Sequence, residues 1–479
     1  MTADGFDAIV VGSGPNGLVG AVELASAGLR VLVVEGAATF GGGLRTEELT
    51  LPGFRHDVCA TVLPMALASR AFRALDLPVS WAHPPVPAAH PLDDGPAALV
   101  HRSVAATAEA LGADERAWRL SVGATAHAGF PLMDTLLAPL SVPRAPLSAL
   151  RFGALGVPPA TMLARALFRT VRARAVFAGM AVHSMLPLGA PITSGYGLLL
   201  AATAHLVGWP VVRGGSQGLA DALVDRLRSL GGELVGGTYV RSLSDLPPAP
   251  ITLLDVTPRQ FLALAGSRLP SSYARRLARY RYGPGVFKID WALSEPVPWR
   301  DPAVAAAGTV HLGGTLEEIA DAEDKVAKGD HPERPFVLLV QPGAADPTRA
   351  PSGSHPLWAY CHVPNGSTVD MTGAIEAQIE RFAPGFRSVV LARHAMDSAA
   401  LEAHNPNYVG GDIGGGSASL SQFAGRPVYS PRPWKTPLQG VYLCSAATPP
   451  GAGVHGMGGL QAARLALRQY EAMRMSVRL

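Results

Sequence analysis

The beginning of the chain has the clearest pattern of apolar and polar positions. A strand-like run covers 7–11, a glycine-rich turn covers 12–17, small and apolar residues cover 18–27, and a second apolar run covers 31–34. This order predicts a buried strand, a tight turn, a helix packed on a sheet, and a second parallel strand. The second run ends at Glu35.

The turn at 12–17 reads GSGPNG, and each of its glycines has a mechanical role. Gly12 permits the tight turn, Gly14 leaves room for a pyrophosphate beside the backbone, and Gly17 lets the helix lie close on the strand. Free N–H groups at the helix start would then face the phosphate charge. Glu35 is placed to accept hydrogen bonds from a ribose 2′-hydroxyl, which disfavours a 2′-phosphate. Together these features predict a dinucleotide site.

Elements of the same kinds recur in two later parts of the chain. They are a helix at 217–230, strands at 233–240, 251–256 and 440–444, and a helix at 460–473. Because distant segments can join one sheet, we expect a discontinuous dinucleotide-binding domain made from 1–75, 210–265 and 430–479.

The remaining segments, 76–209 and 266–429, predict a second, α+β substrate domain. Its first part is helical and rich in Ala, Leu and Arg, which suggests a helical cap. The strand pattern at 283–299 places Lys288 and Asp290 on one face, and apolar strands at 336–341 and 357–363 complete a mixed or antiparallel sheet. A lysine in this setting is either functional or half of a structural ion pair at a sheet edge.

Composition narrows the class of protein. The 479 residues are 48% hydrophobic and 16% charged, which indicates a large apolar interior, an apolar pocket or a surface that touches lipid. A net charge of +3 without a basic cluster disfavours nucleic acid as a partner. Three scattered cysteines, the early first strand and the absence of an 18-residue apolar run predict a cytoplasmic protein without a signal peptide or transmembrane helix.

The segment between Asp134 and Asp221 contains no acid and no lysine. Its seven arginines are Arg144, Arg151, Arg165, Arg169, Arg172, Arg174 and Arg213. Apolar residues from Leu163 to Phe177 run beside them at roughly helical spacing, which is typical of a basic amphipathic helix. Two interpretations stay open: peripheral contact with an anionic membrane, and a cap whose arginines pair with acids elsewhere or in a homo-oligomer.

Four further places carry candidate chemistry. The loop at 41–45, GGGLR, offers backbone and a guanidinium to a cofactor's phosphates, or is a solvated loop. His56 and Asp57 could exchange protons in a site, or form a surface ion pair. Lys288 is the third place, and the strand, glycine loop and helix around His455 put free N–H groups at a helix start. No metal site is expected.

Several of these motifs resemble the phytoene desaturase-related FAD-dependent oxidoreductases of the amine-oxidase-like flavoprotein superfamily. VVGSGPNGLVGAVELASAGLRVLVVE with GGGLRT is similar to their FAD fingerprint and glycine-arginine motif. GVYLCSAATPPGAGVHGMGGLQAA is similar to the C-terminal FAD motif of carotenoid desaturases, and YGPGVFKIDWALSEPVPW resembles the branch of pyridine nucleotide-disulfide oxidoreductase domain-containing protein 2. The resemblance spans nearly the whole chain and implies a Rossmann-type, amine-oxidase-like α/β fold with FAD as the cofactor.

The resemblance also implies roles for single residues. The cofactor-binding residues would be Gly12, Gly14, Pro15, Asn16, Gly17, Glu35, Gly36, Gly42, Gly43, Arg45, Val240, Ala446, Gly453, Val454, His455 and Met457. Lys288 resembles the lysine that reaches flavin N5 through a water in amine oxidases of the superfamily. The candidates for proton handling are therefore Lys288, His455 and His56. A disulfide reductase is rejected because the chain lacks the required CxxxxC pair.

The favoured function is oxidation or reduction of a carbon–carbon bond in a lipophilic, polyene- or isoprenoid-like molecule. The chain has a single dinucleotide motif, so no separate NAD(P)H-binding domain is expected. The electron acceptor would then be oxygen or a quinone. The alternatives are a flavin-dependent isomerase, an amine oxidase, and a flavin-binding module without turnover. The second is disfavoured because no aromatic cage is evident in a chain with 6% aromatic residues.

Overall fold

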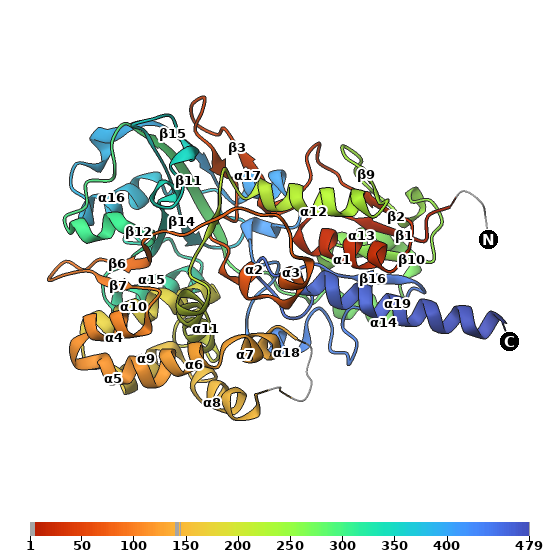
Figure 1. The fold of residues 1–479 in the computed structure, drawn as a ribbon, viewed down its shortest axis with the longest axis horizontal. Coiled ribbons are helices and arrows are strands. Elements are labelled where there is room, and N and C mark those ends of the chain that lie inside the picture. The colour runs from red at the N-terminus through yellow and green to blue at the C-terminus, as the bar shows by residue number, and fades with distance from the viewer. Residues whose placement is uncertain (1–4, 139–142, 144, 479) are drawn as a thin grey trace.

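Two sheets organise the molecule, one at each end of its long axis (Figure 1). The computed structural model describes residues 5–138, 143 and 145–478. One sheet has five strands and lies near both chain termini, and the other has seven strands. Arg144 lies outside the described residues.

The five-stranded sheet is parallel throughout. In spatial order its strands are β16 (Val441–Leu443), β10 (Ile251–Leu254), β1 (Ala8–Val11), β2 (Val31–Val34) and β9 (Glu233–Val235). Strand β9 is shorter than the pattern predicts, because Gly236 and Gly237 turn the chain away, with φ of +67° at Gly237. Val240 therefore lies outside the strand.

Helices cover both faces of the parallel sheet. On one face pack α1 (Pro15–Ser26), α12 (Gln217–Ser229) and α19 (Met457–Arg478), and on the other α13 (Pro258–Ala265) and α14 (Ser271–Leu277). Strand β1 is buried on both sides, since Ala8 and Val10 face the first layer while Ile9 and Val11 face the second. Continuous apolar runs are what a doubly covered parallel strand requires.

The seven-stranded sheet is mixed. Its order is β15 (Val390–Met396), β11 (Gly285–Leu293), β14 (His355–Val363), β13 (Val337–Val340), β12 (Ala307–Leu312), β6 (Val86–His90) and β7 (Ala98–Val100). The β12–β6 pair is parallel and the other pairs are antiparallel. The α/β fold with a parallel nucleotide-binding sheet and a mixed second sheet is thus confirmed, whereas the domain boundaries stay a prediction.

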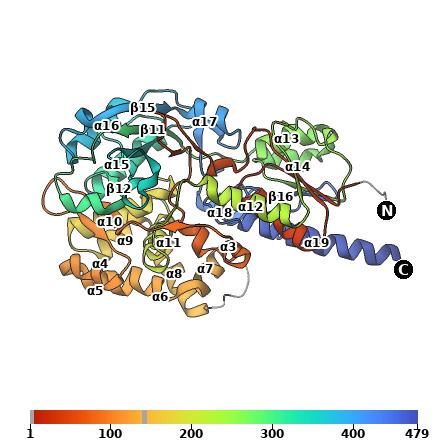
Figure 2. The ribbon, with the colours of Figure 1, turned by 45° about the horizontal axis from the view of Figure 1, so that its top comes forward.

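A cap of helices covers one face of the mixed sheet, and helix α16 (Thr372–Phe382) packs on the other (Figure 2). The cap consists of α4 (Val104–Ala110), α5 (Glu115–Trp118), α6 (Ala124–His127), α7 (Gly129–Leu136), α8 (Pro146–Gly156), α9 (Ala160–Leu167), α10 (Val171–Ala181) and α11 (Thr193–Leu206). No helix among the described residues is both long and apolar enough to span a bilayer.

The expected basic amphipathic helix is wrong as a single element. The chain breaks between α9 and α10, where the Asp114 carboxylate accepts hydrogen bonds from the N–H groups of Arg169 and Thr170. Thr170 then caps α10 by accepting from the Ala173 N–H. The expected apolar stripe is also discontinuous, because within α10 Phe177 is buried while Val171, the first residue of the helix, is 55% exposed.

Candidate functional site

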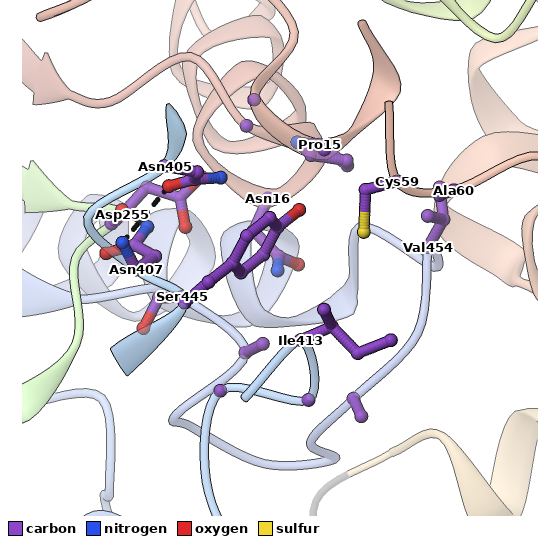
Figure 3. A pocket seen from close by; sticks show the side chains of 18 of the residues that line it. Pro15, Asn16, Cys59, Ala60, Asp255, Asn405, Asn407, Ile413, Ser445 and Val454 are labelled. Atoms are coloured by element: carbon purple, nitrogen blue, oxygen red, sulfur yellow. Dashed lines mark hydrogen bonds between the residues drawn. The ribbon is translucent and has the colours of Figure 1, made fainter. Parts of the chain in front are cut away.

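A cavity of about 880 Å³ connects the two sheets. At one end its wall is the glycine turn after β1 together with Glu35 and the segment 238–241. At the other end the wall is formed by side chains of β12, β13 and β14 and by helix α11. Figure 3 shows the middle of this cavity, with Asp255, Asn405 and Asn407 on one side and Cys59, Ala60 and Val454 on the other.

The two glycine loops form one cradle at the nucleotide end. Gly14 is the N-cap of α1 and, as a glycine, has no side chain with which to cap the helix. A Cβ on Gly42, which has φ of +56°, would lie 2.9 Å from the Gly14 Cα, so the second loop lies directly against the first. A Cβ on Gly43 would lie 2.4 Å from the Tyr408 hydroxyl. This contact excludes side chains and leaves backbone facing the cavity.

Glu35 is fixed by a network of donors. Its Oε2 accepts from the Ser13 N–H at 2.8 Å and the Ser13 hydroxyl at 2.6 Å, and its Oε1 accepts from the Ala37 N–H at 2.9 Å. Arg45 donates to the same carboxylate at 3.4 Å, and its Nε, which is buried, has no partner in the described chain. The acid and the guanidinium thus share one wall of the cavity.

Most of the cofactor residues expected from the sequence line this cavity. They are Gly12, Gly14, Pro15, Asn16, Glu35, Gly36, Gly42, Gly43, Arg45, Val240, Ala446, Gly453 and Val454. Gly17, His455 and Met457 lie behind the wall. His455 uses both ring nitrogens within its own loop: Nε2 donates to the Gly451 carbonyl and Nδ1 accepts from the Met457 N–H, each at 3.1 Å. Burial lowers the pKa of His455 to about 4. Its proton-handling role stays a prediction.

Asp255 was not expected from the sequence. It follows β10, and its Oδ2 accepts from the Gly17 N–H at 2.9 Å, directly at the start of α1. Burial raises its pKa to about 7, against the opposing effect of the Gly17 N–H. The available signal was its position, because ligands of parallel sheets bind at the carboxyl ends of the strands.

The other two candidates for proton handling, Lys288 and His56, lie in one buried cluster. The Lys288 ammonium donates to Asp290 Oδ1 at 2.6 Å, and His56 Nδ1 lies 3.5 Å from the same oxygen. Burial is the main cause that raises the pKa of Asp290 and lowers that of His56 to about 3. Strand β11 lies between β15 and β14, so this is not a sheet-edge pair. Neither Lys288 nor His56 lines the cavity, although the ammonium lies 5.3 Å from the ring centroid of Trp358, which does.

The far end of the cavity has an aromatic wall that was missed in the sequence. Trp358 and Tyr360 stack on β14 with ring centroids 5.9 Å apart, and Tyr196, Trp209 and His183 line the same end. These residues come from segments far apart in the chain, so no local spacing could indicate the cluster.

Comparison with known proteins supports this architecture. Residues 10–76 match the model of the NAD(P)-binding Rossmann-like domain. Solved structures that share the fold include an oxidoreductase from Methanosarcina mazei, with a TM-score of 0.65, 15% identity, and coverage of 96% of this chain and 99% of that one. Putrescine oxidase bound to putrescine gives a TM-score of 0.60 at 16% identity, with 97% and 99% covered. The chain has an amine-oxidase-like fold with a Rossmann-like part.

Two curated relatives extend the comparison. Pyridine nucleotide-disulfide oxidoreductase domain-containing protein 2 from Rattus norvegicus is 26% identical over 98% of this chain and 94% of its own length. One of the subunits of limonene dehydrogenase from Castellaniella defragrans is 35% identical over 22% of this chain and 19% of its own length. A similarity specific to phytoene desaturases is not among these findings, so that finer assignment stays an expectation.

Replacing Asp255 tests its position beside the pyrophosphate expected at α1. We expect Asp255→Asn to bind FAD more tightly than wild type above pH 7, since a carboxylate there repels the phosphates while the protonated form does not. Wild-type affinity should fall by roughly tenfold between pH 6 and pH 8.5, about one pKa unit of coupling, and the variant should lose this dependence. Fluorescence titration with FAD measures both affinities. Asp412→Asn, at another buried carboxyl with a raised pKa, is the control and should keep the wild-type slope.

Lys288 is tested with its partner. Lys288→Met leaves Asp290 buried and unpaired, so unfolding in urea should show a loss of roughly 3–5 kcal/mol. Lys288→Met with Asp290→Asn should recover most of that stability. If Lys288 handles protons at the flavin, the double variant should still reoxidise slowly with oxygen after photoreduction. Recovery of both stability and rate would show that the pair is structural.

Proposed function

We propose that the protein is an FAD-dependent oxidoreductase acting on a carbon–carbon bond of a lipophilic, polyene- or isoprenoid-like molecule. The observation that carries this proposal is the continuity of the cavity. A glycine cradle with a ribose-binding acid opens into an aromatic and aliphatic chamber, so one wall serves a dinucleotide and the other an apolar molecule. FAD, when bound, would supply the hydride chemistry, and the protein would supply binding and orientation.

The residues at the nucleotide end fit FAD. Asn16 Oδ1 and Gln260 Oε1 are buried, belong to residues that line the cavity and have no hydrogen-bond partner in the described chain. Unpaired buried polar atoms are rare in folded proteins, so a ligand that satisfies them is expected. The first turn of α1 carries no acidic residue of its own, and the Asp255 carboxyl that accepts from the Gly17 N–H there has its pKa raised to about 7 by burial. Glu35 would hold the adenosine ribose, and Gly14 and Gly42 would admit the pyrophosphate.

The charges around the chamber favour a neutral substrate over an amine. The carboxylates that line the cavity are Glu35 and Asp255, and both belong to the nucleotide end. A protonated amine at the aromatic end would therefore lack an anionic partner among the described residues, and an unpaired buried charge is costly. The aromatic wall by itself would suit a cation. The lack of a carboxylate lining that end is what makes the chamber unsuited to a diamine such as putrescine. The name of the limonene dehydrogenase relative also agrees with an isoprenoid substrate.

The proposal is tested by measuring both FAD binding and the mass of the product. Purified protein reconstituted with FAD should show flavin absorption. Incubation with isoprenoid candidates under oxygen or a quinone should give a product two hydrogens lighter if the reaction is a desaturation, and protein carrying photoreduced FAD without oxygen should give a product two hydrogens heavier if it is a saturation. Mass spectrometry of the product decides between the alternatives, because an isomerase leaves the mass unchanged. A protein that stays colourless after reconstitution would falsify the proposal.

We also propose that the cap contacts an anionic membrane where such a substrate enters. Helix α8 exposes Leu147 at 81% and Leu150 at 72%, Val157 directly after the helix is 53% exposed, and α9 adds Met162 at 55%. The exposed Arg151 lies in the same helix, and no acid occurs between Asp134 and Asp221. Apolar residues beside arginines without acids suit a lipid surface.

Vesicle flotation tests the membrane contact. Wild type should float with anionic vesicles and much less with neutral ones. Leu147→Gln with Leu150→Gln should weaken binding by roughly tenfold or more, since each leucine contributes about 1.5–3 kcal/mol when buried in lipid. Leu391→Gln, at an exposed leucine of β15, should have no effect. Equal absence of binding to both vesicle types would exclude the contact, and sedimentation of the unbound protein would then reveal self-association through the cap.

A further inference from the structure

Three histidines lie at the aromatic end of the cavity: His90 and His311 are buried behind its wall, and His183 is partly buried. His90 on β6 and His311 on β12 are neighbours on the same face of the mixed sheet, with ring centroids 6.5 Å apart. His183, which follows α10, places its Nε2 3.0 Å from the Nε2 of His311. Burial lowers the pKa of His183 to about 3 and that of His90 to about 4, so these rings are neutral at pH 7. Of the three, His183 lines the cavity.

The contacts of His90 and His311 determine where the protons lie. His90 Nε2 is 2.7 Å from the Gly314 carbonyl, which can only accept, so Nε2 carries the hydrogen and Nδ1 is a lone pair. His311 Nδ1 is buried and has no partner in the described chain. A Cβ on Gly179 would lie 2.7 Å from His311 Nδ1 and 3.0 Å from His90 Nδ1, so a Cα–H bond of Gly179 lies against both atoms. Such a bond tolerates a lone pair as a weak acceptor but would clash with an N–H.

This argument assigns the tautomer of His183. With a lone pair on Nδ1, neutral His311 carries its hydrogen on Nε2 and donates it to His183 Nε2. His183 then carries its own hydrogen on Nδ1. That atom makes no hydrogen bond with the described residues, and the ring lines the cavity. The site therefore presents an N–H donor to a ligand.

Two further groups at the same end are unpaired. Thr309 and Trp358 both line the cavity, and their Oγ1 and Nε1 atoms are buried without a partner in the described chain. Val340 pairs with both residues across β13, so they lie in one row of the sheet. The cationic side chains that line the cavity are Arg45 and Arg241, which flank the nucleotide end. Lys288 lies 5.3 Å from the Trp358 ring centroid but outside the cavity, and Asp290 pairs its charge. The aromatic end thus offers hydrogen-bond donors without an unpaired positive charge.

We propose that the aromatic end binds an uncharged carbonyl oxygen of the substrate, with the N–H groups of His183 and Trp358 as donors. A pure hydrocarbon would leave these donors unpaired, and a carboxylate would be buried without a cation. The substrate class is therefore a lipophilic ketone, aldehyde, ester or quinone. This inference rests on the proposed function in one respect, which is that FAD occupies the opposite end of the cavity.

Matched ligands test the proposal on the FAD-loaded protein. The probes are geranylacetone, the hydrocarbon with a methylene in place of its carbonyl, and the carboxylic acid of similar length. Quenching of tryptophan fluorescence reports binding, because Trp209 and Trp358 line the chamber. The ketone should bind roughly tenfold or more tightly than the hydrocarbon, as expected for donors otherwise left unsatisfied, and more tightly than the ionised acid at pH 8. Equal affinities for ketone and hydrocarbon, or no binding of either, would overturn the proposal.

Variants identify the donor. His183→Phe and Trp358→Phe should each reduce the preference for the ketone to within about threefold. His183→Gln, which restores an N–H donor, should keep most of the preference, and His355→Phe on β14 should keep all of it. A preference unchanged in both phenylalanine variants would contradict the assignment. Flavin absorbance is recorded separately, so failure to bind FAD would count against the proposed function while the ligand preference still tests the carbonyl site.

Discussion

The close approach of backbone to backbone at the start of α1 is the constraint on which the rest of the structure depends. A Cβ on Gly17 would lie 2.2 Å from the Gly12 carbonyl, and one on Gly459 would lie 1.8 Å from the Asn16 carbonyl. Segments separated by more than 400 residues therefore meet without side chains between them. Because α1 is held between the strand turn and α19, its N-terminus faces a fixed point in the cavity. A ligand anchored there has its far end directed to the mixed sheet.

The mixed sheet continues the site through its register. Thr309, Val340, Trp358 and Asp290 are successive cross-strand partners on one face, and His311, Leu338, Tyr360 and Lys288 form the next row. The centre of both rows lines the cavity, while titratable side chains flank it on either side. Ionisable groups thus sit beside the apolar floor without interrupting it. Histidines become neutral through burial on one flank, and the lysine is paired with a carboxylate on the other.

The sequence pattern predicted those features that depend on residues close together in the chain. The β1–α1–β2 unit follows from apolar runs and glycine spacing, and Lys288 meets Asp290 because side chains alternate along a strand. The break between α9 and α10 depends on Asp114, about 55 residues away, which no periodicity reveals. The same holds for the aromatic end, whose residues meet only once strand register and cap packing are set. Asp255 could have been inferred, since it follows a buried strand of the parallel sheet.

The buried lysine that stood out in the sequence acts on the cavity through a neighbour. Its ammonium lies over the indole of Trp358, and a cation at a ring face draws electron density towards itself. The polarised indole has a more positive edge, so its unpaired Nε1–H becomes a better donor. Asp290 offsets part of this field because it holds the ammonium from the other side, which also explains how a full charge is tolerated at 3% exposure. The ion pair and the donor-lined chamber are therefore parts of one arrangement, in which the charge stays outside the cavity while its field reaches the wall.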